Sequence, residues 1–218
     1  TLRVDTPRLA GRTSDVPTAG HVEIDGRGHT LSGVADAETL VLITGSTLSD
    51  ITLKRGTLRG GKRLTKAEII NELSRMKIRP LQDRILHMHL ADCALDAITS
   101  EGGRLLTVED CTITGAGGHA ILADTAMAII RKLGIYAVGG DGIHIPVAAP
   151  RQTREHILLA RQVSIVDTDG DGIDAADTAA NLSELTIQDA GGNGATLGKD
   201  ADCYKDISIT LVTGDALQ

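Results

Sequence analysis

The chain has 218 residues, of which 41% are hydrophobic and 23% charged, which is enough apolar material for a core of its own. Its net charge of -7 arises from 29 acidic and 22 basic residues, and this balance argues against nucleic acid as the main partner because phosphate backbones are repelled. No run approaches the roughly 18 to 20 apolar residues that cross a bilayer, so no membrane span is expected.

Aromatic residues are almost missing, with no Phe, no Trp and 2 Tyr. Large rings supply much of the bulk of an ordinary globular core. This composition therefore predicts a core of thin, regular layers of aliphatic side chains, which favours a solenoid. It also leaves few aromatic faces for stacking against sugars.

Residues 1–20 precede the repeats described below and are predicted to form an N-terminal extension or cap. The chain begins at Thr1 without the apolar core of a signal peptide, so we expect a processed chain or an excised fragment. The expected location is extracellular, periplasmic or on a virion surface. The three cysteines show neither a CxxC pair nor a metal-ligand spacing, so we expect mostly buried thiols.

Apolar and polar residues begin to alternate in residues 21–26 and 48–53, as in strands with one buried face. Residues 62–84 then break this pattern. The segment TKAE at 65–68 is a capping box, and apolar residues follow at helical spacing until Pro80. The pattern predicts an amphipathic helix near 64–78. Its basic face is either a solvated outer surface or a docking surface for an anionic polymer or a partner.

A repeat of about 22 residues organises the rest of the chain. A polar residue followed by a small and an aliphatic one recurs at Asp96, His119, Asp141, Asp171, Asn193 and Asp215. An aliphatic column keeps the same spacing at Leu90, Ile113, Ile135, Ile165, Ile187 and Ile209. A unit this short cannot bury its apolar face alone, so successive coils must stack and their strands must run parallel.

Glycine pairs recur in the predicted turns, at 117–118, 139–140 and 191–192. Turns need glycine for a positive φ or for close approach of two backbones. Because the pairs recur in successive coils, we interpret them as turn residues rather than as a phosphate-binding loop.

Residues 24–33 (IDGRGHTLSG) and 140–145 (GDGIHI) resemble coils of the pectate-lyase-like superfamily, which includes carbohydrate-active enzymes and phage tailspikes. The resemblance implies an all-β fold, a right-handed parallel β-helix, over residues 21–218 with insertions at about 62–84 and 146–156. It specifies the coil rather than a reaction. The fixed motifs of alginate epimerases and polygalacturonases do not occur, so no catalytic residue carries over from those families.

The second insertion, 146–156, lengthens one coil and is predicted to form a wall of a binding groove. Arg151 and Arg154 within it, together with Thr196 on a later coil, are the predicted substrate-binding residues.

Stacking brings four candidate catalytic residues into one patch beside this insertion: Asp141, His144, Asp171 and Asp174. Neighbouring carboxylates raise one another's pKa, and a histidine serves as acid or base near neutral pH. The alternative is structural, because Asp before Gly favours a turn and a turn that recurs repeats its Asp.

Residues 167–172 (DTDGDG) begin like the calcium loop of an EF-hand but lack Glu at the twelfth position, which is Thr178. Asp167 and Asp169 are therefore candidates for a different calcium site at a corner of the coil, and a solvated acidic turn is the alternative. No cofactor is required by these patterns, and calcium is the one candidate ion.

The combined prediction is a β-helix that processes or binds extracellular polysaccharide, as a lyase, hydrolase or epimerase. Whether it is an enzyme stays open, because a non-catalytic structural or adhesive module, such as a segment of a trimeric tailspike or surface fibre, fits the same repeat. The last coil stops at Gln218 without a cap, so another subunit or further chain is expected to cover this edge.

Overall fold

The computed structural model of the chain is an all-β parallel solenoid with about 22 residues per turn, which confirms the predicted fold class. It describes residues 2–4, 23–32, 41–43, 47–54, 58–60, 82–147, 156–198 and 203–218. The predicted helix near 64–78, Arg151 and Arg154 lie outside these ranges. Within them, no helix is long and apolar enough to cross a membrane.

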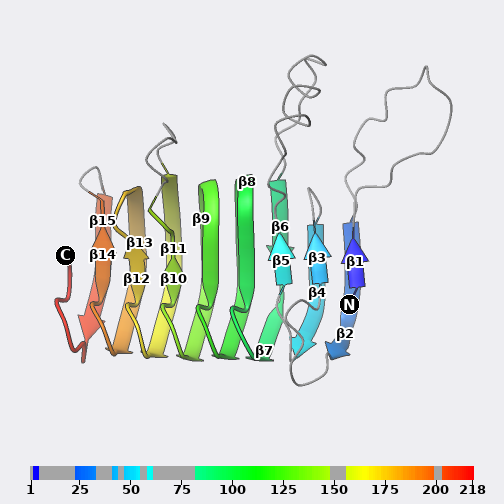
Figure 1. The fold of residues 1–218 in the computed structure, drawn as a ribbon, viewed down its shortest axis with the longest axis horizontal. Helices are drawn as coiled ribbons and strands as arrows, with labels where there is room; N and C mark the ends of the chain where they lie inside the picture. Colours follow the sequence, from blue (N-terminus) through cyan, green and yellow to red (C-terminus); the bar gives the residue numbers. More distant parts are fainter. Residues whose placement is uncertain are drawn as a thin grey trace, which may run out of the picture.

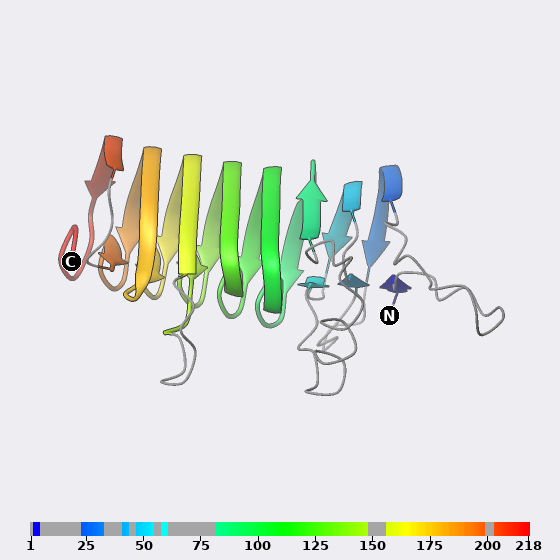
Figure 2. The ribbon, with the colours of Figure 1, turned by 90° about the horizontal axis from the view of Figure 1, so that it is seen from above.

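Within these ranges, fifteen strands form one sheet that winds along the long axis, with β2 near one end and β15 at the other (Figures 1 and 2). The strands are β1 (Leu2–Val4), β2 (Glu23–Ser32), β3 (Val41–Ile43), β4 (Thr47–Lys54), β5 (Leu58–Gly60), β6 (Gln82–Leu86), β7 (His89–Cys93), β8 (Ile98–Ala116), β9 (Ile121–Val138), β10 (Ile143–His144), β11 (His156–Thr168), β12 (Ile173–Ala175), β13 (Thr178–Ala190), β14 (Ala195–Leu197) and β15 (Cys203–Thr210).

Strand pairing is parallel and keeps the register that the repeat predicts. Ile143 of β10 pairs with Ile121 of β9 on one side and with Ile173 of β12 on the other. The number of residues between paired positions is larger where β4 pairs with β6, since Thr47 lies opposite Arg84. Residues 2–4 belong to the sheet as well, since β1 pairs with β3.

The core consists of inward columns of aliphatic residues, as predicted. Five members of the main column are fully buried: Leu90, Ile113, Ile135, Ile165 and Ile187. Two of the cysteines, Cys93 and Cys111, lie in the same core, and burial raises the pKa of the Cys111 thiol to about 12. Stacking of like side chains thus fills the interior without large rings.

Two bends in each turn have a positive φ, and almost all of them fall on residues other than glycine. The first bend is at His87, Asp110, Lys132, Gln162, Glu184 and Asp206, and the second at Asp92, Gly115, Ala137, Asp167, Asp189 and Leu211. The glycine pairs are needed instead where the backbones of two successive turns approach closely. A Cβ on Gly139, for example, would lie 2.6 Å from the carbonyl oxygen of Gly117 on the preceding turn.

Candidate functional site

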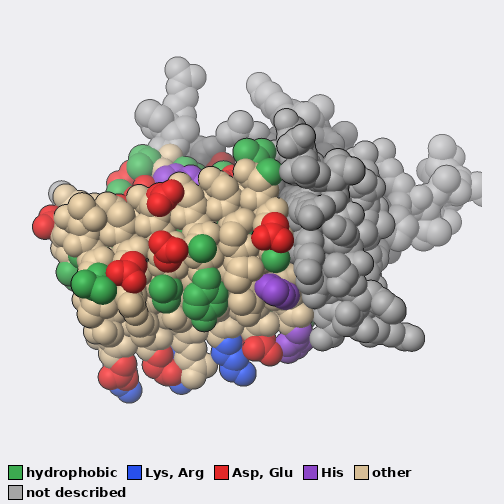
Figure 3. Space-filling model, turned by 90° about the horizontal axis from the view of Figure 1, so that it is seen from below, with side chains coloured by type: hydrophobic (Ala, Val, Ile, Leu, Met, Phe, Trp, Pro, Cys, Tyr) green, Lys and Arg blue, Asp and Glu red, His purple; other side chains and the backbone are tan. Residues whose placement is uncertain are grey.

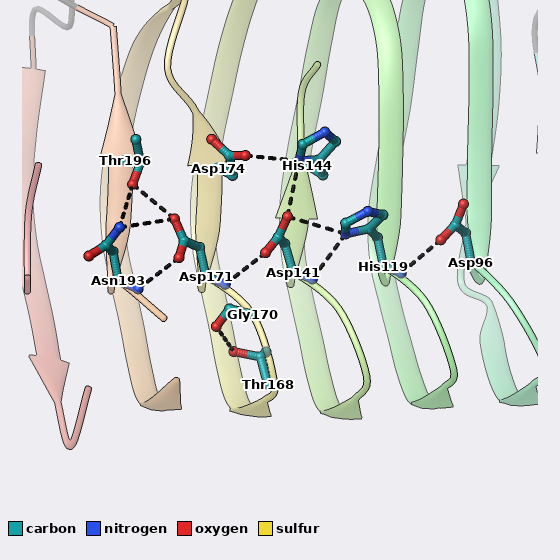
Figure 4. A network of polar contacts seen from close by, with 10 residues as sticks. All are labelled: Asp96, His119, Asp141, His144, Thr168, Gly170, Asp171, Asp174, Asn193 and Thr196. Carbon is teal, nitrogen blue, oxygen red and sulfur yellow. Dashed lines mark hydrogen bonds and ion pairs between the residues drawn. The ribbon is translucent and has the colours of Figure 1, made fainter. Parts of the chain in front are cut away.

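A ladder of side-chain acceptors runs along the turns that follow the long strands (Figure 4). Each member accepts a hydrogen bond from the backbone N–H of the equivalent residue one turn later. The donor-to-acceptor distances are 2.7 Å for His119 to Asp96, 3.0 Å for Asp141 to His119, 2.7 Å for Asp171 to Asp141, 2.7 Å for Asn193 to Asp171 and 2.9 Å for Asp215 to Asn193. We call Asp96, His119, Asp141, Asp171 and Asn193 the acceptor ladder.

The acceptor ladder explains why glycine precedes the polar residue in these turns. A Cβ on Gly170 would collide with Oδ1 of Asp141, and one on Gly192 would collide with Oδ1 of Asp171. The glycine therefore leaves room for the acceptor that satisfies the next backbone N–H. Glycine and carboxylate form one structural motif, and the recurrence of Asp in the turns follows from it.

A second polar column lies beside the acceptor ladder, three residues further along the chain. The Thr99 hydroxyl donates to Oδ2 of Asp96 at 3.5 Å, and Nδ2 of Asn193 donates to the Thr196 hydroxyl at 3.1 Å. His144 occupies this column and contacts Asp141 in the same way.

Four residues from three successive turns form what we call the histidine–aspartate cluster: His119, Asp141, His144 and Asp174 (Figure 4). Nδ1 of His144 lies 3.0 Å from Oδ2 of Asp141 and 3.1 Å from Oδ2 of Asp174. Nδ1 of His119 lies 3.3 Å from the same Oδ2 of Asp141. The two imidazole rings stack, with centroids 4.6 Å apart and planes 12° from parallel.

The hydrogen bonds determine different tautomers for the two histidines. Nδ1 of His119 accepts the Asp141 N–H, so the proton of its neutral ring is on Nε2. Nδ1 of His144 faces two carboxylates and therefore carries a proton that it donates.

Burial and charge displace the pKa values of the cluster in opposite directions. Burial raises the pKa of Asp141, but hydrogen bonds with His119, His144 and the Asp171 N–H outweigh it and hold that pKa well below its usual range. The hydrogen bond to Asp141 raises the pKa of His144, although burial opposes it. Burial raises the pKa of Asp174 against the attraction of His144. Two neighbouring carboxyl groups thus differ in how readily they hold a proton.

Three of the four predicted catalytic residues come together: Asp141, His144 and Asp174. Asp171 contacts Thr196 instead, whose hydroxyl donates to its Oδ2 at 2.9 Å. Both residues lie beside the cluster, but their side chains contact each other rather than His144.

The two candidate calcium ligands, Asp167 and Asp169, do not belong to the cluster. Asp167 occupies a positive-φ bend, and the side chains of Asp167 and Asp169 are exposed. His119 was absent from the predicted catalytic set, although its spacing of 22 residues from Asp141 already placed it in the adjacent turn.

Acidic side chains are spread over the face formed by these turns, while Lys and Arg lie along one edge of it (Figure 3). This distribution favours cations and neutral polar ligands over polyanions.

No protein-family model matches the chain, and no curated protein matches it either. The resemblance to the pectate-lyase-like superfamily therefore stays a prediction.

Proposed function

We propose that the protein binds and processes an extracellular polysaccharide at the histidine–aspartate cluster. The main support for this proposal is that Nδ1 of His144 lies between the carboxylates of Asp141 and Asp174. A carboxyl group held beside an imidazole can move protons to and from sugar oxygens or carbons, as lyases, hydrolases and epimerases require.

Asp174 is the group we assign to proton transfer. The Asp141 carboxylate already accepts a hydrogen bond from the backbone N–H of Asp171, whereas the ion pair of the Asp174 side chain within the described residues is with His144. Its side chain is 32% exposed, so a bound polymer can reach it. In this assignment His144 positions Asp174, and Asp141 fixes His144.

Asp174→Asn should lower the rate of polymer conversion by at least about 100-fold, because it removes a proton-transfer group and keeps the shape. The assay uses the full chain with a panel of neutral and uronic-acid glycans, of which the acidic surface favours the neutral ones, and follows new chain ends and epimerised units. The matched control is Asp189→Asn, an exposed carboxylate at a bend, which should keep full activity. Unchanged glycans throughout the panel, or an equally active Asp174→Asn protein, would refute the proposal.

The alternative function is a structural or adhesive module. Leu211 is 71% exposed and Leu217 52% exposed, and β15 pairs with β13 alone among the described strands. In such a module, a second copy of the chain or further chain would cover both leucines. Light scattering should then give a mass of two or three chains, with Leu211→Lys shifting it toward one. A monomer at high concentration contradicts this alternative.

A further inference from the structure

We propose that Nδ1 of His119, Oδ2 of Asp141 and Nδ1 of His144 form a binding site for a divalent transition-metal ion of the zinc class. This inference does not rest on the proposed polysaccharide activity. Asp174, to which that activity is assigned, is not one of the three ligands.

The positions of the three ligand atoms already approach those of a coordination sphere. All three lie within 4.8 Å of one another. Oδ2 of Asp141 is 3.3 Å from Nδ1 of His119 and 3.0 Å from Nδ1 of His144. In tetrahedral coordination, bonds of about 2.0 to 2.1 Å separate ligand atoms by about 3.3 Å. The ligand atoms are therefore close enough to share an ion, and admitting it requires the two imidazole rings to turn.

The ligand types select the class of metal. Two imidazole nitrogens and one carboxylate oxygen suit zinc, cobalt, nickel or copper, whereas calcium and magnesium prefer sites made of oxygen. Three protein ligands leave a fourth position for water. The site therefore differs in chemistry and in place from the predicted calcium site at Asp167 and Asp169.

The solenoid itself does not require the two histidines. Aspartate or asparagine fills the position of His119 in other turns of the acceptor ladder, and threonine fills the position of His144 at Thr99 and Thr196. Both histidines nevertheless lie beside the same carboxylate, on neighbouring turns, with stacked rings. A metal site gives this pairing a reason that the coil does not.

Metal binding changes specific contacts. The ion takes the Nδ1 lone pair of His119, so the Asp141 N–H loses its present acceptor. It also replaces the Nδ1 proton of His144, and both rings must turn out of their parallel stack. The side chains of all three ligands are partly exposed, so an ion from solvent can enter.

The test measures binding of Zn²⁺ by calorimetry and of Co²⁺ by visible absorption, using the full chain after treatment with a chelator. We expect one ion per chain, with a tetrahedral Co²⁺ spectrum and no competition from Ca²⁺. His119→Asn should bind at least about 10-fold more weakly while keeping the fold, because its amide oxygen can accept the Asp141 N–H as Asn193 does for Asp215. His144→Thr should show the same loss.

The matched control is His87→Gln. His87 and Asp110 form an exposed pair at 2.9 Å, outside the cluster. This variant should bind like the unaltered chain. Absence of binding in the unaltered chain, or equal affinity in His119→Asn and His144→Thr, overturns the metal site and leaves the proposed function standing.

Discussion

Gly172→Ala is expected to destabilise the fold by about 3 kcal/mol, because the added methyl group has no space between two turns. A Cβ on Gly172 would lie 2.5 Å from the carbonyl oxygen of Gly194 and 2.6 Å from Cγ2 of Ile187. Both atoms belong to the following turn, and Ile187 is fully buried. The methyl group must therefore push apart two stacked turns whose hydrogen bonds fix their separation.

Gly134→Ala is the matched control for Gly172→Ala. A Cβ there would meet the ring of Tyr136, an exposed side chain that can turn away. We expect stability within about 0.5 kcal/mol of the original, since alanine also lowers the conformational entropy of the unfolded chain. Urea unfolding of the two variants checks this difference, and equal losses of stability would contradict the packing that we describe.

Asp171→Ala is expected to cost about 2 kcal/mol of stability, the second large effect. The substitution leaves the backbone N–H of Asn193 without its 2.7 Å acceptor and removes the partner of the Thr196 hydroxyl. Asp171→Asn should keep most of the stability, because an amide oxygen accepts the same kind of hydrogen bond at Asn193. A loss as large in Asp171→Asn as in Asp171→Ala would show that charge, rather than the acceptor ladder, is what this position contributes.

The repeat made most of the fold predictable from the sequence. The spacing of Ile135, Ile165 and Ile187 places one aliphatic residue per turn in the core, and the structure buries all three. Regular stacking turns a sequence interval directly into a neighbour relation. The same reasoning correctly placed His144 beside Asp141 and Asp174.

The direction of individual side chains could not be predicted in this way. A shared interval groups Asp171 with Asp141, yet Asp171 turns its carboxylate toward Thr196 rather than toward His144. The positions of the positive-φ bends could not be predicted either, because residues as different as Lys132, Ala137 and Gln162 occupy them. Their conformation is imposed by the stacked turns and not by residue type. The choice between alanine and glycine at one position of the turn was not predicted either. Alanine is buried there at Ala97 and Ala120, whereas later turns have Gly142 and Gly172 at the same position.

Carboxylates of the acceptor ladder serve the coil, Asp141 in addition to its role in the cluster, whereas Asp174 serves the cluster alone. Urea unfolding of Asp171→Ala and Asp174→Ala, measured side by side, tests this division most directly. We expect a loss of about 2 kcal/mol for Asp171→Ala, and at most about 0.5 kcal/mol for Asp174→Ala, whose contact with His144 is partly exposed. Equal losses in the two variants, or a larger loss for Asp174→Ala, would contradict the division between structural and functional carboxylates.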